Sequence, residues 1–305
     1  MRLRVKSGWM VMIICAQLLA GTLLLECNGR SSSRRVAPSQ DAVVTLPVLA
    51  LDGDGSPVTD LTQNDLKLYE GGKERPIELL ARDPALPVRA GFLLDMSRSD
   101  SNSVKLLEGA NIAAPLLRTG DSGFVAAFAE RGALMCPLSS DLGRIQEAIN
   151  CGFDPQSLGV GTALYDAIFY ACSEKLSLRS GHQALIVFSD MGDNASLHTP
   201  EAALAEAQRT RNAIYPIVLR DIFSSRDDHF SSAGERAAHT LASETGGVCF
   251  RASTVVAAQG ALRLIRIYLD NTYMIKYAPA LLRVASIKVR CSRKGIRVVV
   301  PSRRF

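Results

Sequence analysis

The sequence predicts an α/β fold: a doubly wound, mostly parallel sheet of six strands flanked by helices, together with a small β-sandwich module. From Pro87 onward, short apolar runs alternate with helical segments, which is typical of a parallel sheet covered on both faces. Before and after this region, short strands and turns follow one another without helices. The 305 residues, 47% of them hydrophobic, suffice for one α/β domain and a smaller companion.

The alternating region covers residues 86–270 and contains six predicted strands and six predicted helices. In an open α/β sheet, ligands bind outside the carboxyl ends of the strands, so polar residues that directly follow strands mark candidate sites. The strands are expected at Arg89–Leu94, Gly123–Phe128, Gly132–Pro137, Ala184–Phe188, Ala213–Leu219 and Gly247–Phe250. The helices are expected at Val104–Leu117, Leu142–Ile149, Ala163–Leu176, Pro200–Arg211, Ala233–Thr245 and Val255–Leu269.

Two further segments read as β-structure. Residues 41–85 begin with the apolar run from Val43 and continue through the turn Asp52–Pro57. Residues 271–305 contain a strand after Asn271 and two basic segments that alternate like strands. We expect the two segments to pair into a sandwich from which the α/β domain emerges as an insertion.

The N-terminus resembles an export signal. Arg2, Arg4 and Lys6 precede the largely apolar run Met10–Leu25, which is longer than a usual signal core but slightly short for a full membrane span. A cleaved signal peptide and a retained membrane anchor therefore both remain possible, and the protein is expected to be periplasmic, membrane-anchored or extracellular. The predicted segments are a signal peptide or anchor (1–27), a linker (28–40), a β module (41–85), the α/β domain (86–270) and C-terminal strands (271–305).

Charge is unevenly distributed along the chain. Residues 1–35 carry six basic residues and one acidic residue, and residues 281–305 carry eight basic residues and no acidic one, so the remainder is acidic overall. A basic tail could attract nucleic acid or an anionic membrane. Because the basic residues alternate with apolar ones and no aromatic residue interleaves with them before Phe305, they are expected to form the solvated face of a sheet. Nucleic acid is not an expected partner.

Three oxygen-bearing side chains follow the first strand of the α/β domain. Asp95, Ser97 and Ser99 occupy alternate positions where the apolar run enters a polar loop. Hard divalent cations prefer oxygen ligands, and one carboxylate with two neutral hydroxyls leaves much of the charge of such an ion uncancelled. Helix capping is the alternative role for these residues, because Asp and Ser also satisfy free amides at helix N-termini.

Two later loops supply further oxygen ligands. Thr162 follows a glycine-containing loop before a predicted helix, and Asp190 ends another apolar strand. Alone, Thr162 could be a helix N-cap and Asp190 could begin a turn with Gly192, Asp193 and Asn194. The conjunction of three loops, two of them at strand ends, favours one shared cation site.

These motifs resemble the von Willebrand factor type A domain, whose metal-ion-dependent adhesion site combines Asp-x-Ser-x-Ser, a Thr and an Asp from three loops. The resemblance implies that Asp95, Ser97, Ser99 and Thr162 bind Mg²⁺, with Mn²⁺ or Ca²⁺ as substitutes, and that Asp190 reaches the ion through water. It further implies a protein partner that presents an acidic residue. Met191 departs from the pattern, because many relatives have Gly there. Residues 57–73 resemble the leader of a bacterial exported group within the family.

The expected function is therefore non-catalytic, metal-dependent protein binding, with two alternatives. A Mg²⁺-dependent hydrolase is disfavoured because Asp95 has no acidic residue two positions away and no phosphate-cradling Lys motif is near. The four histidines show no paired metal spacing. The second alternative is a scaffold that binds partners without metal, through a recognition segment at Asp221–Ser232.

Overall fold

The computed structural model describes residues 43–97, 111–150, 155–176, 181–219, 228–280 and 284–304. All of them belong to one compact unit, Pro38–Phe305. The predicted targeting segment, the predicted linker, Ser99 and residues 221–227 of the predicted recognition segment lie outside the described residues. In the part of the chain that the structure describes, no helix is both long enough and apolar enough to cross a bilayer.

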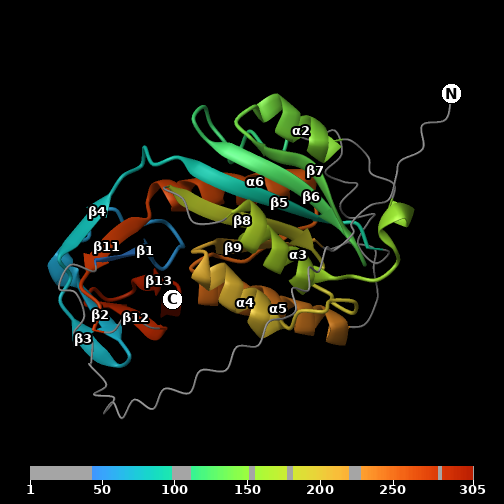
Figure 1. Cartoon of the computed structure of the whole chain (residues 1–305). Coiled ribbons are helices and arrows are strands. Elements are labelled where there is room, and N and C mark those ends of the chain that lie inside the picture. The colour runs from blue at the N-terminus through green and yellow to red at the C-terminus, as the bar shows by residue number, and fades with distance from the viewer. Residues whose placement is uncertain are drawn as a thin grey trace, which may run out of the picture. The chain divides into compact units, whose positions relative to one another are not determined.

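The α/β domain is built on one six-stranded sheet, as the sequence predicted (Figure 1). The strand order is β10-β9-β8-β5-β6-β7, and every neighbouring pair is parallel except β6 and β7. β5 and β8 lie at the centre, where almost every residue is buried, which explains their continuous apolar sequences. The strands are β5 (Val88–Asp95), β6 (Ser122–Phe128), β7 (Gly132–Ser139), β8 (His182–Ser189), β9 (Ala213–Leu219) and β10 (Phe250–Ala252).

Helices cover both faces of this sheet (Figure 1). One hydrophobic cluster joins the sheet to α2 and α6, and a second joins the opposite face to α3, α4 and α5. Thr199 and Thr254 cap α4 and α6, because each hydroxyl accepts a backbone N–H from the first turn. The helices are α2 (Leu142–Asn150), α3 (Leu164–Tyr170), α4 (Pro200–Arg209), α5 (Asp228–Thr245) and α6 (Val255–Asp270), and the π-helical segment η3 (Ala171–Lys175) continues α3.

Three predicted boundaries are wrong. The helix expected at Val104–Leu117 does not include residues 111–117, which form turns, because Pro115 lacks the N–H that a helix interior needs. The last strand starts at Phe250 rather than Gly247. The recognition segment expected up to Ser232 is helical from Asp228, since extending an existing helix costs little once it is nucleated.

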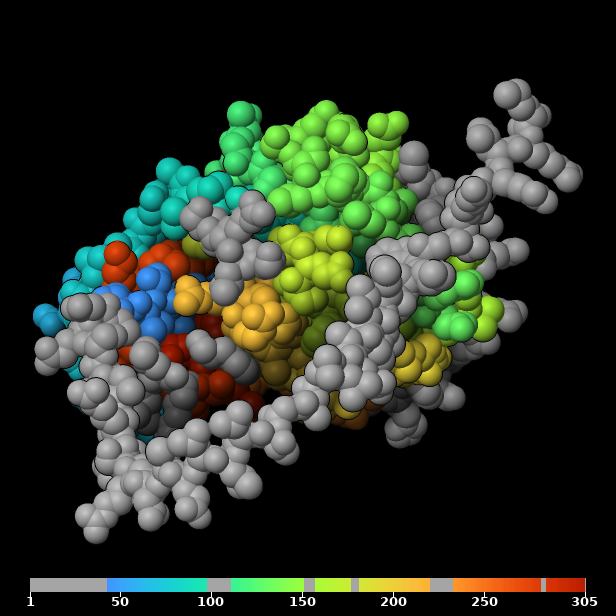
Figure 2. Space-filling model, viewed as in Figure 1, coloured from blue at the N-terminus to red at the C-terminus, as the bar shows by residue number. Residues whose placement is uncertain are grey.

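The N- and C-terminal strands form the predicted sandwich of two four-stranded sheets. Figure 2 shows the N-terminal residues in blue beside the C-terminal residues in red. The sheet orders are β13-β1-β11-β4 and β14-β12-β2-β3. The strands are β1 (Val44–Leu51), β2 (Leu66–Glu70), β3 (Lys73–Arg75), β4 (Leu79–Arg82), β11 (Tyr273–Tyr277), β12 (Ala285–Cys291), β13 (Arg297–Val299) and β14 (Arg303–Arg304), and two short 3₁₀ turns are η1 (Gln63–Asp65) and η2 (Pro155–Leu158).

Pairing between the two ends of the chain confirms that the α/β domain is an insertion in the sandwich. β1 pairs antiparallel with β11, and β2 pairs antiparallel with β12. Side chains from all four strands share one core. The basic residues of β12 alternate as expected, because Lys288 and Arg290 are exposed while their neighbours Ile287 and Val289 are buried. The sandwich therefore fixes both ends of the inserted domain.

A close backbone approach at Gly247 explains why the last strand starts late. A β-carbon added there would overlap the carbonyl oxygen of Ile214 in β9. We expect Gly247→Ala to lower the free energy of unfolding by about 1–3 kcal/mol, because the backbone must move to relieve the overlap. Denaturant unfolding measures this change. Gly53→Ala is the matched control, because nothing lies within 4 Å of that position, and an equal loss in both variants would contradict the assignment.

Candidate metal centre

The first predicted loop begins at a buried carboxylate. Asp95 is the last residue of β5 and is fully buried, as is Ser97. One carboxylate oxygen, Oδ1, accepts the backbone N–H of Ser97 at 2.9 Å, and the other, Oδ2, accepts the hydroxyl of Ser189 at 2.6 Å. The central position of β5 in the sheet thus buries Asp95, while β8 supplies its hydrogen-bonding partner.

The electrostatic state of Asp95 is unusual. Burial, with a smaller contribution from the nearby charge of Asp190, raises its pKa to about 6 against the hydrogen bonds from Ser189 and Ser97, which lower it. Among the described residues, no Lys, Arg or His forms an ion pair with Asp95. A buried carboxylate normally has a cationic partner. The site therefore fits a bound cation.

The third predicted loop follows β8 directly. The Ser189 hydroxyl that donates to Asp95 also accepts the backbone N–H of Met191 at 2.8 Å. Asp190 accepts the N–H of Gly192 at 2.8 Å through Oδ1. This side-chain interaction forms a tight turn. The second carboxylate oxygen, Oδ2, accepts no hydrogen bond from any residue that the structure describes. Asp190 can therefore turn a carboxylate oxygen toward a water or an ion.

Met191 adopts a left-handed backbone conformation that glycine adopts without strain. Its φ is 66°, in the left-handed region, yet its side chain is buried against the helix-covered face of the sheet. The left-handed conformation costs a residue with a β-carbon about 1–2 kcal/mol. Burial of the Met side chain offsets that cost, so the loop keeps the turn without a glycine.

A pair of variants separates these two contributions of Met191. Met191→Ala loses the buried side chain and keeps the strained backbone, whereas Met191→Gly loses the side chain and the strain together. We expect both to be less stable than the wild type by about 2–4 kcal/mol, with Met191→Gly the more stable of the two by about 1 kcal/mol. Denaturant unfolding gives the order, and a more stable alanine variant would contradict the strained turn.

The second predicted loop is bound to the third. Thr162 is buried, and its backbone N–H donates to the side-chain oxygen of Asn194 at 2.8 Å. Its carbonyl accepts the backbone N–H groups of Asn194 and Ala195 at 2.9 and 3.0 Å. Gly161 permits this approach, because a β-carbon there would lie 2.9 Å from that of Ala195. Three hydrogen bonds thus hold Thr162 against the loop that carries Asp190.

The N-terminus of α3 is capped from the third loop, not by Thr162. The N-cap position is Ala163, which has no capping side chain. Instead, Asp193 accepts the N–H of Leu164 at 2.9 Å, and Ser196 accepts the N–H of Tyr165 at 3.0 Å. The N-cap role considered for Thr162 is therefore wrong, and its hydroxyl is not used for capping.

Asp166 in the first turn of α3 fixes the far end of the third loop. Its carboxylate accepts the backbone N–H groups of Leu197 and His198 and contacts Nδ1 of His198 at 2.6 Å. Burial raises the pKa of Asp166, but these hydrogen bonds and the His198 ring outweigh it and lower the pKa overall. The His198 ring stacks on Phe169 with centroids 3.9 Å apart.

The structure places four of the five predicted ligand residues on three loops at the carboxyl edge of the sheet. Asp95 and Ser97 lie in direct contact, Ser189 and the charge of Asp190 link them to the third loop, and Thr162 is bound to that loop. Ser99 is not described. Among the described residues, no cluster of three His, Cys, Asp or Glu side chains could hold a metal, so a cation here depends on hydroxyl oxygens.

Sequence reasoning missed the residues that position these loops. Asp193, Asn194 and Ser196 read as an ordinary turn, and His198 read as an isolated histidine. The sequence did contain a signal. More polar residues follow the buried strand, over 190–198, than a simple turn requires.

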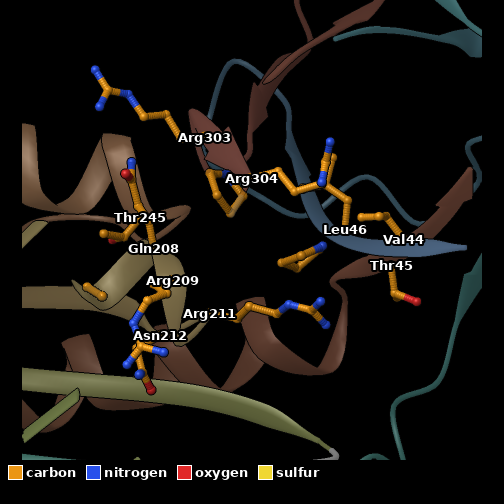
Figure 3. Close-up of a pocket in the computed structure, with 13 residues that line it drawn as sticks. Val44, Thr45, Leu46, Gln208, Arg209, Arg211, Asn212, Thr245, Arg303 and Arg304 are labelled. Atoms are coloured by element: carbon orange, nitrogen blue, oxygen red, sulfur yellow. The ribbon is translucent and has the colours of Figure 1, made fainter. Parts of the chain in front are cut away.

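One cavity lies away from this edge. It is about 30 Å³ and lies between β1 and the segment that follows α4 (Figure 3). Because Asn212 directly precedes β9, this is the amino edge of the sheet. Two of the arginines that line the cavity are already paired, Arg209 with Glu206 and Arg304 with Glu70. The cavity therefore contributes nothing to the cation site.

Comparisons with known proteins give matches at the level of structure. The sequence matches no family model and no curated protein. BatB from Bacteroides thetaiotaomicron aligns over 58% of this chain and 95% of its own, with 18% identity and a TM-score of 0.45. An aerotolerance-related membrane protein from Bacteroides fragilis aligns over 59% of this chain and 98% of its own, with 18% identity and a TM-score of 0.42.

Proximal thread matrix protein 1 from the mussel byssus, in a structure with a zinc-occupied MIDAS motif, aligns over 65% of this chain and 48% of its own, with 18% identity and a TM-score of 0.49. This chain thus spans about half of that protein. At these identities, the similarity concerns the fold alone. The strand order, the antiparallel edge strand and the helices on both faces give the described part of residues 86–270 the doubly wound α/β fold that the sequence predicted.

Proposed function

We propose that this protein is a non-catalytic binding module that recognises a protein partner through a bound divalent cation. Asp95, Ser97, Ser99 and Thr162 would hold the cation, and Asp190 would hold a water molecule bound to it. When bound, the ion supplies an open coordination position that a Glu or Asp carboxylate of the partner can occupy. Mg²⁺ is the proposed ion, with Mn²⁺ or Ca²⁺ as substitutes.

The observation that carries this proposal is the buried carboxylate of Asp95, which forms no ion pair with any described residue. Its raised pKa reports that the charged form lacks compensation in the metal-free protein. The same carboxylate accepts hydrogen bonds from Ser97 and Ser189, which favour the charged form. A divalent cation would supply the missing positive charge at the strand end, where the fold concentrates ligands.

The composition of the ligand set favours partner binding over a closed structural site. At most two carboxylates, those of Asp95 and Asp190, would offset the charge of the ion, and Asp190 is expected to act through water. The remaining ligands are neutral hydroxyls, so the ion keeps affinity for another anion. The hydrogen bonds of Asn194, Asp193 and Asp166 hold the loops in place before a partner arrives, which reduces the entropy that binding must offset.

A hydrolytic role receives less support from the same residues. His198, the histidine of the third loop, is held by Asp166 and stacked on Phe169. His182 is buried at the amino end of β8, at the opposite edge of the sheet. His182 is therefore not placed to exchange protons with a substrate bound beside Asp95. We further propose that the protein acts outside the cytoplasm, on the basis of its N-terminal sequence.

Partner capture with and without metal tests the proposed function. The chain is immobilised in Mg²⁺, exposed to extract from its source, washed, and then treated with EDTA. We expect EDTA to release bound protein and Thr162→Val to abolish capture, because valine keeps the shape of threonine and removes only the hydroxyl. Thr240→Val, on the exposed face of α5, is the matched control. Capture that survives both EDTA and Thr162→Val would contradict the proposal and favour a metal-independent scaffold.

A further inference from the structure

We propose that an apolar rim beside the cation site recognises a large apolar side chain next to the partner's coordinating carboxylate. The apolar rim consists of Val160, Leu197 and Tyr170. This inference rests on the proposed function, because the carboxylate is the anchor from which the neighbouring residue is positioned. The partner is accordingly a protein segment in which an acidic residue has an apolar neighbour.

The three rim residues expose apolar side chains, Val160 on the second loop, Leu197 on the third loop and Tyr170 at the end of α3. Val160 is 72% exposed, Leu197 90% and Tyr170 51%. His198 lies between Leu197 and Tyr170. It follows Leu197 in the sequence, and its ring lies edge-on to that of Tyr170 with centroids 5.5 Å apart. Single exposed apolar residues are ordinary, but a group of them beside a candidate binding site indicates a contact surface.

Leu197 is held in its exposed position by the protein. Its backbone N–H donates to the carboxylate of Asp166 at 3.0 Å, and the following residue, His198, is bound to the same carboxylate twice. Ser196, on its other side, binds Asp193 and the N-terminus of α3. A fixed apolar side chain loses little entropy when a partner covers it, which is a property of binding surfaces rather than of loose connectors.

The chain itself limits the distance between the rim and the cation site. Val160 is two residues from Thr162, so their Cα atoms are at most about 7 Å apart, at about 3.6 Å per residue. Leu197 is three residues from Asn194, so their Cα atoms are at most about 11 Å apart, and Asn194 in turn binds Thr162. An extended peptide advances about 3.3 Å per residue. An apolar residue within about three positions of the coordinating carboxylate can therefore reach Val160.

Glu130 adds a second restriction on the partner. Its carboxylate lies against the second loop, 3.4 Å from the backbone nitrogen of Val160. Among the described residues, Glu130 takes part in no ion pair. A second acidic residue of the partner would meet this charge and be repelled. The site thus selects one acidic residue with apolar neighbours and rejects an acidic run.

Selection from a library of displayed random peptides tests the inference. Peptides are bound to the full chain in Mg²⁺ and eluted with EDTA. We expect the eluted peptides to contain an Asp or Glu with Leu, Ile, Phe or Met within three positions. Representative peptides should bind about tenfold more weakly when that apolar residue is replaced by Ser, which corresponds to burial of one such side chain.

The rim variant Val160→Ser/Leu197→Ser identifies the surface responsible. Both positions are exposed, so the melting temperature should not change. We expect this variant to keep EDTA-dependent selection of acidic peptides and to lose the apolar preference. Leu264→Ser, at an exposed position of α6, is the control and should keep both the selection of acidic peptides and the apolar preference.

The apolar rim and the proposed cation-dependent binding are contradicted by different results. Acidic peptides without an apolar preference, or a preference that survives in the rim variant, would overturn the rim while leaving the cation site intact. Peptides that EDTA does not elute, or that lack an acidic residue, would overturn the proposed function and the rim together.

Discussion

Asp95→Asn is expected to stabilise the metal-free protein and to abolish its stabilisation by Mg²⁺. In the metal-free wild type at neutral pH, the raised pKa of Asp95 corresponds to a destabilisation of about 3 kcal/mol, at about 1.4 kcal/mol for each tenfold change in proton affinity. Asparagine removes the charge and keeps the size of the side chain. Because some hydrogen bonding is lost as well, we expect a net gain of about 1–2 kcal/mol.

The same substitution should remove the response to metal. With Mg²⁺ at a hundredfold excess over its dissociation constant, the wild type gains about 2.7 kcal/mol, which raises the melting temperature of a chain of this length by about 5 °C. Thermal unfolding with Mg²⁺ and with EDTA measures both effects. Asp54→Asn makes the same chemical change in an exposed turn and should change neither value. A loss of stability without metal, or an unchanged Mg²⁺ shift, in the Asp95 variant would contradict the account of this site.

Glu70→Gln is expected to destabilise the sandwich strongly. Glu70 is buried at the end of β2 and accepts two hydrogen bonds from Arg304, one from the backbone N–H of Ala280 and one from the hydroxyl of Tyr277. Glutamine would remove the counter-charge that Glu70 supplies to the buried Arg304. Breaking a buried pair in this way costs about 3–5 kcal/mol. Denaturant unfolding measures the loss, with the exposed Glu74→Gln as control.

The pH dependence of this effect has a definite sign. Burial raises the pKa of Glu70, but the hydrogen bonds from Ala280 and Arg304 outweigh it, so the pKa lies below its ordinary value of 4.5. The pair therefore contributes its full stability above pH 4.5 and loses it as the pH falls through the lowered pKa. The difference in stability between the wild type and Glu70→Gln should shrink in that acidic range. A constant difference would contradict the assigned role of the charge.

Much of the fold followed from local sequence patterns. β5 and β8 were predictable because central parallel strands are buried on both faces and therefore read as continuous apolar runs. The location of Asp95 and Asp190 at one edge followed, since parallel strands place their carboxyl ends together. The pairing of β1 with β11 was predicted from the two β segments that flank the α/β region.

The remaining features depend on contacts between distant residues. Asp193 caps a helix that begins 29 residues before it, and nothing in the turn sequence identifies that helix. The partner of Glu70 lies 234 residues further along the chain. Pro115 did signal the end of a helix, but the apolar residues around it fitted a helical pattern equally well. The conformation of Met191 is set by its burial against the sheet, which no local pattern records.

Anomalous diffraction from crystals grown with Mn²⁺ tests the cation site most directly, because manganese scatters anomalously and accepts the oxygen ligands that magnesium prefers. The account predicts one Mn²⁺ coordinated by Asp95, Ser97, Ser99 and Thr162, with Asp190 linked through a water molecule. It also predicts that this peak is absent from Asp95→Asn crystals grown in the same way. A Mn²⁺ bound elsewhere, or crystals in which Thr162 and Asp190 lie beyond reach of an ion at Asp95, would contradict the proposed cation site.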